Sequence, residues 1–188
     1  MDSRIEMLSS EEAKRRAAEM ELPEALAELN VFRVMLHQPL LAKALSDLLL
    51  AQLLRGALDA RLRELIIMRI GWATGCDYEW TQHWRIAQER FGCSEDDLLA
   101  LRDWRASERF GPAERAVLAA TDETLASGAI SAATWAEVEA AFPSPGERLE
   151  VVSAIGTWHL ISNVARGIGF PLEEGVASWP PDGIAPTG

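Results

Sequence analysis

The sequence predicts an all-α protein. Strand signals are scarce, because the 188 residues include only one Tyr and five Phe, and Val and Thr rarely alternate with polar residues. Long stretches are instead rich in Ala, Leu, Glu and Arg, with apolar residues at the three- and four-residue spacing of an amphipathic helix. With 48% apolar and 25% charged residues, the chain suits one globular core. We therefore expect residues 1–188 to form a single domain.

The N-terminal part of the chain is predicted to form three helices. Proline is tolerated in the first turn of a helix but interrupts its interior, so Pro23 opens one helix and Pro39 the next. Gly56 is suited to a helix end. The helices cover about residues 10–21, 23–36 and 39–56, and about residues 1–22 form an N-terminal helical extension.

Two helices are predicted at the centre of the fold, over residues 59–75 and 76–91. The first has apolar residues around most of its circumference, which is typical of a helix covered on nearly all sides. Thr74 and Gly75 interrupt it, and Gly92 suits the left-handed position after the second helix. We expect this pair to form the middle of the core.

The second half of the chain continues the helical pattern. Ser94 and Asp97 resemble a capping box, Gly128 is a stop signal and Ser131 a start signal. About residues 172–188 are rich in Pro and Gly and are expected to form an extended tail, able to pack on a neighbouring subunit. The remaining helices cover residues 95–104, 112–128, 131–142 and 146–169.

Composition limits the partners. A net charge of -11 and a pI near 4.8, with no cluster of Lys and Arg, argue against nucleic acid or an anionic membrane. The first residues lack the basic-then-apolar order of a signal peptide, and the apolar runs are too short to span a bilayer. We expect a cytoplasmic protein that binds a small molecule. Its two cysteines, Cys76 and Cys93, would then be reduced thiols.

The stretch "GCDYEWTQH" gathers titratable side chains. At about 100° per residue, Cys76, Glu79 and His83 fall within a helical stripe about 60° wide, whereas Tyr78 is less clearly part of it. Glu79 precedes His83 by four residues, a spacing that allows a hydrogen bond and favours the protonated imidazole. Cys76 lies near the helix start, where backbone N–H groups stabilise a thiolate. The same pattern also fits a surface ion pair beside a packed cysteine, so spacing alone does not settle the matter.

A longer segment, "GALDARLRELIIMRIGWATGCDYEWTQHWRIAQERFGCSEDDLLAL", resembles the carboxymuconolactone decarboxylase family, and the similarity runs from "HQPLLAKAL" to "GFPLEEG". The resemblance implies the alkylhydroperoxidase D-like helical fold, an orthogonal helix bundle, and a homo-oligomer (dimer, trimer or hexamer). It also implies that no cofactor is needed.

The thiol peroxidase branch of this family uses a C-x-x-C motif, a His four residues after the second Cys, and a Glu on the preceding helix. By resemblance these positions correspond to Cys76, His83 and Glu64, but Glu79 replaces the second cysteine. Cys76 therefore cannot close the motif disulfide, and Cys93 lies 17 residues further on.

The resemblance thus favours the decarboxylase-like branch, which acts on a small carboxylated lactone or a related acid. Glu79 and His83 would be general acid/base partners, Glu64 would orient His83 or relay a proton, and Cys76 would line the pocket. The candidates for additional pocket residues are Tyr78, Trp80, Arg69 and His159.

Two alternatives remain open from the sequence. One is a thiol peroxidase that uses Cys76 with Cys93 or with an external thiol. The other is a non-catalytic binding or assembly protein on the same scaffold. A carboxylate and imidazole set such as Glu64, Glu79 and His83 can also bind divalent ions, but no second His accompanies it, and we expect no metal.

Overall fold

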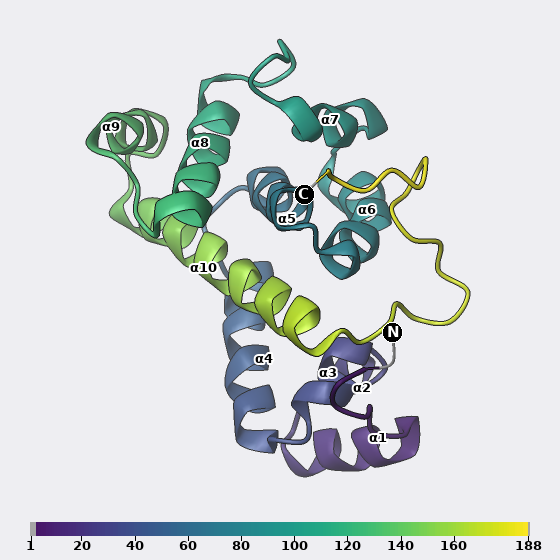
Figure 1. The fold of residues 1–188 in the computed structure, drawn as a ribbon. Helices are drawn as coiled ribbons and strands as arrows, with labels where there is room; N and C mark the ends of the chain where they lie inside the picture. Colours follow the sequence, from purple (N-terminus) through teal and green to yellow (C-terminus); the bar gives the residue numbers. More distant parts are fainter. Residues whose placement is uncertain (1–2, 188) are drawn as a thin grey trace. The chain divides into compact units, whose positions relative to one another are not determined.

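The computed structural model describes residues 3–187 of the chain, and within them it contains ten α-helices, one 3-10 helix and no strand (Figure 1). The all-α prediction is confirmed. The residues group into two compact units, one of Met1–Arg55 with Asn163–Val176, the other of Gly56–Ser162 with Ala177–Gly188. The expectation of a single domain stays a prediction. Within the described residues, no helix has both the length and the apolar character needed to cross a bilayer.

The first unit contains the N-terminal helices. Ser9 caps the first of them by accepting a hydrogen bond from the Glu12 N–H, and Pro39 opens the last, as predicted. The elements are α1 (Ser10–Glu19), α2 (Glu24–Ala27), α3 (Asn30–Met35) and α4 (Pro39–Leu54).

The single helix expected over residues 23–36 is wrong, because the structure forms α2 and α3 instead. Leu29 lies between them with extended backbone (φ −77°, ψ 134°). The Asn30 N–H donates to Glu173 Oε1 at 3.0 Å, and the Asn30 side chain donates to Pro171 O at 3.2 Å. A segment about 140 residues away thus satisfies the start of α3, and the local sequence carries no sign of it.

The second unit contains the predicted central pair, α5 (Ala60–Thr74) and α6 (Asp77–Phe91). Gly75 and Gly92 end them in the left-handed conformation, with φ of 67° and 69°. The predicted capping box at Ser94 is also present. The other elements are α7 (Glu95–Ala100), η1 (Leu101–Asp103), α8 (Pro112–Ser127), α9 (Ala132–Ala141) and α10 (Pro145–Ile168), of which residues 145–162 belong to this unit.

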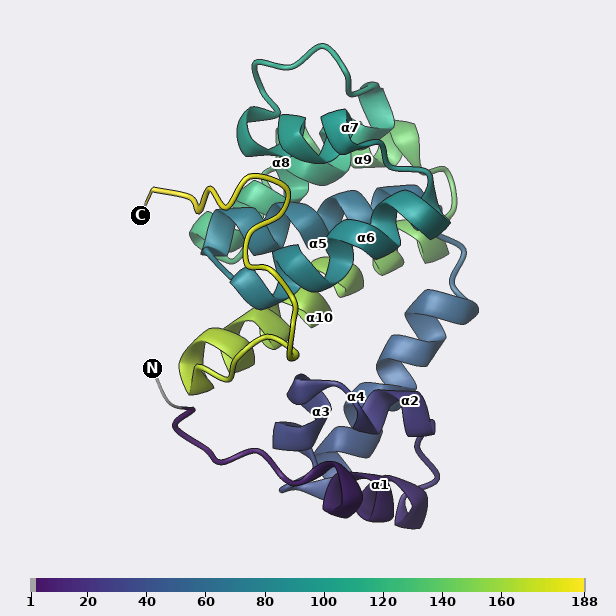
Figure 2. The same ribbon diagram turned by 90° about the vertical axis from the view of Figure 1, so that its right-hand side faces the viewer.

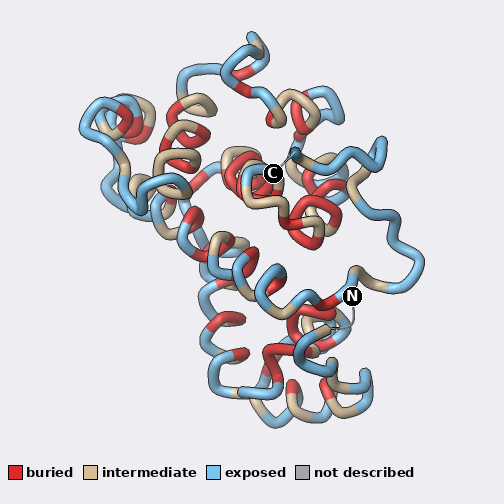
Figure 3. The backbone as a smooth tube through the Cα atoms, viewed as in Figure 1, coloured by how far each residue is buried: buried red, intermediate tan, exposed pale blue. Residues whose placement is uncertain are grey.

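Helix α5 is the most enclosed element of the second unit (Figure 3). It packs on α6, α8 and η1, and the expectation of a core helix is confirmed. Its fully buried apolar side chains are Leu65, Ile66, Ile67, Met68 and Ile70.

The backbones of α5 and α6 approach closely at Gly71. A Cβ atom at this position would lie 2.9 Å from the Trp80 backbone nitrogen and 3.3 Å from the Glu79 Cβ, closer than atoms pack without strain. Glycine is therefore required here by the spacing of the helices. This contact fixes how the side chains of α5 meet those of α6.

The tail has no helix, as expected, and its residues 177–187 belong to the second unit (Figure 2). The Trp179 N–H donates to Asp77 Oδ1 at 3.0 Å, and the Trp80 indole donates to Pro180 O at 2.8 Å. The tail therefore packs on the first turns of α6 in its own chain. Packing on a neighbouring subunit stays a prediction.

Candidate active site

The central helix pair brings two carboxyl groups and an imidazole together. Glu64 on α5 is fully buried, and its Oε2 lies 2.8 Å from Nδ1 of His83 on α6. Glu79, one turn before His83 on α6, is 3% exposed. Glu64, Glu79 and His83 form what we call the acid cluster. Its three members are those that the sequence and the resemblance had singled out.

The geometry within α6 differs from the simple expectation of a hydrogen-bonded pair. Glu79 Oε2 and His83 Nε2 are 3.9 Å apart, which is within ion-pair distance but too long for a hydrogen bond. The imidazole bonds instead to Glu64 through its other nitrogen. Glu79 Oε2 is a buried polar atom with no hydrogen-bond partner among the described residues.

Arg63 adds a buried positive charge beside the acid cluster. It is 3% exposed, its Nη2 lies 3.6 Å from Glu64 Oε1, and its guanidinium stands 5.1 Å from the centre of the Phe91 ring. Sequence reasoning missed this residue, because side chains adjacent in a helix do not normally face one another. The only available signal was an arginine placed next to the candidate glutamate.

Burial and charge set the protonation of the cluster. Burial raises the pKa of the Glu79 carboxyl to about 7, although the charge of His83 opposes this. Burial alone would lower the pKa of His83, but the charge and hydrogen bond of Glu64 raise it above its usual value. Glu79 can therefore hold and release a proton near neutral pH, and His83 is favoured in its protonated form.

The two thiols occupy different environments. Cys76 is the N-cap of α6, 1% exposed, with backbone angles outside the helix (φ −90°, ψ 93°). The helical angle count that aligned it with Glu79 and His83 therefore holds only for the latter two. Cys93 is also buried, and burial raises the pKa of its thiol to about 12. Neither cysteine forms a disulfide, and Cys93 is not poised to act as a thiolate.

Two of the additional pocket candidates serve the packing of the second unit. Arg69 binds Asp122 through both nitrogens of its fork (Nε–Oδ1 2.6 Å and Nη2–Oδ2 3.2 Å) and also donates to Leu101 O. Arg69 is therefore a partly buried counter-charge for Asp122, which is not in the acid cluster. Trp80 is fully buried and bonded to the tail.

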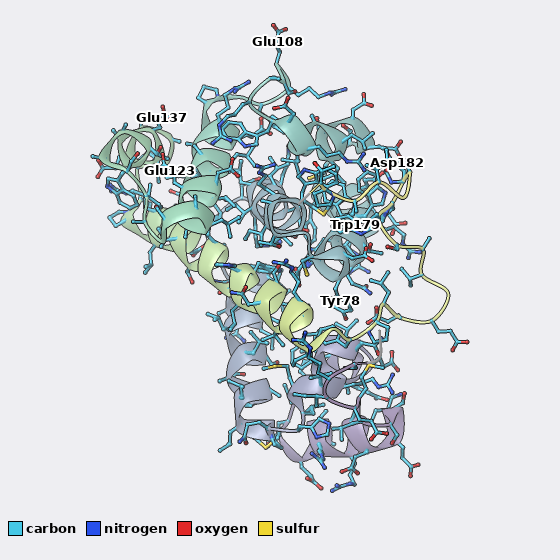
Figure 4. All side chains as sticks on the ribbon, viewed as in Figure 1. Tyr78, Glu108, Glu123, Glu137, Trp179 and Asp182 are labelled. Carbon is cyan, nitrogen blue, oxygen red and sulfur yellow. The ribbon has the colours of Figure 1, made fainter. Side chains whose placement is uncertain are left out.

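The other two pocket candidates, Tyr78 and His159, lie on different helices. Tyr78 is buried on α6 (Figure 4). His159 is half-buried on α10, and no polar contact joins it to Glu64, Glu79 or His83. Its neighbour Trp158 was not a candidate, yet its ring meets the His83 ring edge-on at 6.3 Å. Trp158 thus supplies an apolar wall to the imidazole.

In the described part of the chain, no group of three or more His, Cys, Asp and Glu side chains is spaced to hold a metal ion. A cavity of about 820 Å³ lies between α8 and α9, and no member of the acid cluster lines it. Arg115 in that cavity already donates to the carbonyls of Phe110 and Ser107. The chemistry that the structure offers is therefore concentrated in the acid cluster, where a buried acid stands beside a carboxylate-bound imidazole.

Residues 39–123 match the carboxymuconolactone decarboxylase family, a segment that contains Glu64, Arg63, Glu79 and His83. No curated protein sequence matches the chain.

Solved structures share the fold. One is a protein of unknown function from Agrobacterium tumefaciens, proposed to be an antioxidant defence protein AhpD, with 25% identity over 73% of this chain and 94% of its own, and a TM-score of 0.65. An uncharacterised peroxidase-related protein with an alkylhydroperoxidase AhpD core from Ralstonia eutropha JMP134 has 17% identity, coverage of 93% and 94%, and a TM-score of 0.73. The debrominase Bmp8 in complex with 2,3,4-tribromopyrrole has 19% identity, coverage of 93% and 94%, and a TM-score of 0.69. The predicted alkylhydroperoxidase D-like helical fold is confirmed.

Proposed function

Because residues 39–123 match the carboxymuconolactone decarboxylase family, we propose that the protein is an enzyme that removes carbon dioxide from a small carboxylated lactone or a related organic acid. The reaction uses acid–base groups of the chain and no redox cofactor. The single observation that carries the proposal is the pairing of Glu64 Oε2 with His83 Nδ1, at 2.8 Å, beside the buried carboxyl of Glu79.

The proposed reaction needs one bond to break and one proton to arrive. The bond between the substrate carboxylate and its neighbouring carbon breaks, carbon dioxide leaves, and the electron pair stays on the substrate. That carbon then accepts a proton, for which Glu79 is the donor, since its pKa of about 7 leaves a large fraction of the carboxyl protonated near neutral pH. His83, held by Glu64, returns a proton to Glu79 after each turnover.

Burial of the acid cluster supports this assignment. Glu64 is fully buried and Glu79 is 3% exposed, and the Trp158 ring covers one edge of His83. A carboxylate that leaves as neutral carbon dioxide is favoured by a site that holds little water. The same enclosure strengthens the attraction of the positive imidazole for charge that develops on the substrate.

The test is release of carbon dioxide from a set of carboxylated lactones by the wild type and by Glu79→Gln. Loss of the proton donor should lower kcat by roughly 10²- to 10⁴-fold. The matched control is Glu89→Gln, an exposed glutamate on the same helix, which should keep wild-type kcat. No release by the wild type, or equal release by Glu79→Gln, would reject the proposal.

A thiol peroxidase is the second candidate, and the position of Cys76 favours it. As the N-cap of α6, Cys76 lies where helix N–H groups stabilise a thiolate. The raised pKa of Cys93 argues against a second reactive thiol in this chain, so an external thiol would be needed. Peroxide consumption with dithiol present, compared between wild type and Cys76→Ser and followed by intact mass, decides between the candidates. Turnover that depends on Cys76 would favour the peroxidase.

For partners, we propose a small-molecule substrate and assembly of the chain with copies of itself, in an order that light scattering would give. The acidic surface, with its net charge of -11, supports the absence of a nucleic-acid partner.

A further inference from the structure

We infer that Glu79 Oε2 and His83 Nε2 together bind a single oxygen atom of the substrate, one that becomes negatively charged during the reaction. The inference deepens the proposed function and rests on it, because it names the substrate feature that the acid cluster recognises. It concerns where the electron pair goes once the carboxylate has left.

Glu79 Oε2 and His83 Nε2 are separated by a distance that suits one shared oxygen atom. At 3.9 Å they are too far apart to bond to one another, but one oxygen placed about 2.8 Å from each would meet both at an angle near 90°. Glu79 Oε2 has no hydrogen-bond partner among the described residues, although the Glu79 side chain is only 4% exposed. A buried polar atom of this kind needs a partner from outside the chain, and its position 3.9 Å from His83 Nε2 suits an oxygen shared by the two.

Both atoms can donate to that oxygen. Nδ1 of His83 is engaged by Glu64, so Nε2 is the ring nitrogen left to meet a ligand, and in the protonated ring it carries a hydrogen. The protonated carboxyl of Glu79 is likewise a donor. An oxygen at this point would therefore receive two hydrogen bonds, the arrangement that stabilises an oxyanion.

The charge of the surroundings favours a negative oxygen. The protonated imidazole of His83 is positive, and the guanidinium of Arg63 lies on the other side of Glu64, 3.6 Å from its Oε1. These positive charges attract an enolate oxygen placed against His83. The His83 side chain is 18% exposed, against 4% or less for the two carboxyl groups, so a ligand reaches the pair past the imidazole.

The inferred substrate is therefore an acid whose carboxylate is attached to a saturated carbon next to a carbonyl group, directly or through one intervening C=C bond. When the carbon–carbon bond to the carboxylate breaks, carbon dioxide leaves and the electron pair moves into the adjoining π system and onto the carbonyl oxygen. The resulting enolate is held by His83 and Glu79. Glu79 then gives its proton to carbon, and the carbonyl group re-forms as the electron pair returns from oxygen.

The experiment measures binding of 4-nitrophenol, whose phenolate is a stable mimic of an enolate and whose absorbance reports its ionisation. Wild type should bind it as the phenolate. Glu79→Gln keeps a donor at this position and should retain the affinity, although it loses turnover. Glu79→Leu removes the donor and should weaken phenolate binding by roughly tenfold or more. The control Glu89→Leu, on the exposed face of α6, should bind as wild type.

Circular dichroism and thermal unfolding check that each variant is folded, and Glu79→Met replaces Glu79→Leu if the latter is not. The absence of phenolate binding by the wild type, or an unchanged affinity in the folded apolar variant, overturns the inference. Phenolate binding that depends on Glu79 but is accompanied by no decarboxylation would reject the proposed function and leave the oxygen site standing. The two ideas therefore fail in different measurements.

Discussion

Glu64 Oε2 accepts a hydrogen bond of 2.8 Å from His83 Nδ1, joining two residues that are 19 positions apart and lie on different helices. The bond fixes which ring nitrogen faces Glu79, and the negative charge of Glu64 favours the imidazolium form. The chemistry of the acid cluster depends on this contact more than on the four-residue spacing of Glu79 and His83.

Glu64→Gln should lower the pKa of His83. The wild-type pKa lies above the usual 6.5, since the charge and hydrogen bond of Glu64 overcome the effect of burial. With a neutral amide in place of Glu64, burial and the charge of Arg63 lower the His83 pKa, and only the charge of Glu79 opposes them. An NMR titration of the imidazole C–H signals, assigned with His37→Gln and His159→Gln, measures the change. An unaltered pKa in Glu64→Gln would contradict this account of the contact.

Glu79→Gln should make stability less sensitive to pH. Below the unfolded pKa of 4.5, Glu79 is protonated in both the folded and the unfolded state and does not make stability depend on pH. Between 4.5 and its folded value of about 7, only the unfolded state ionises, so stability falls as pH rises and then levels off. The total loss is about 3 kcal/mol.

Urea unfolding at a series of pH values tests this point. Between pH 4.5 and about 7, the free energy of unfolding should fall less in Glu79→Gln than in the wild type. This difference should persist at higher pH. Glu89→Gln, which changes an exposed carboxylate, should follow the wild type. Parallel curves for wild type and Glu79→Gln would show that burial does not raise this pKa.

Gly71→Ala should destabilise the protein and impair the active site together. Its Cβ would lie 2.9 Å from the Trp80 backbone nitrogen, and relief requires moving α6 relative to α5, at a cost of about 1–3 kcal/mol. The control is Gly156→Ala in α10, where nothing lies within 4 Å of the new Cβ and stability should rise by up to about 1 kcal/mol. Thermal unfolding of both variants tests the contrast, and equal effects would refute the proposed close contact.

Arg102→Ala should release the tail. The Arg102 guanidinium binds Asp182 through two nitrogens, at 2.7 and 2.9 Å, and stacks 4.7 Å from the Trp72 ring. Trp179 and Asp182 both lie on the tail (Figure 4). Hydrogen exchange over residues 177–184 should quicken in this variant. Arg85→Ala, on an exposed surface ion pair, is the control, and protection that survives in Arg102→Ala would mean that other contacts hold the tail.

The sequence predicted the helices of the second unit well, because their ends carry local signals. Gly75, Gly92 and Gly128 all adopt the left-handed conformation that stops a helix, and Ser94 and Ser131 cap the next ones. The break at Leu29 was missed because its cause is the distant Glu173 side chain. The residues around Leu29 carry no Pro or Gly that would predict the break.

For the site, spacing alone placed Glu79 and His83 on one helical face, and only the resemblance brought in Glu64. Helix periodicity cannot show which residues of two helices meet, because that depends on how the helices pack. The orphaned Glu79 oxygen and the placement of Arg63 against Glu64 are likewise products of tertiary structure. They became visible only in three dimensions.

The close approach at Gly71 bears on how this scaffold can acquire new reactions. At Gly71 the backbone of α5 lies directly against the Trp80 backbone and the Glu79 Cβ, and this contact limits how closely α5 and α6 can approach. Libraries that vary positions 64, 79 and 83 should therefore leave the helix spacing in place while they change the reactive groups. The pair of helices is a fixed frame on which evolution, or a protein engineer, can exchange an acid for a thiol.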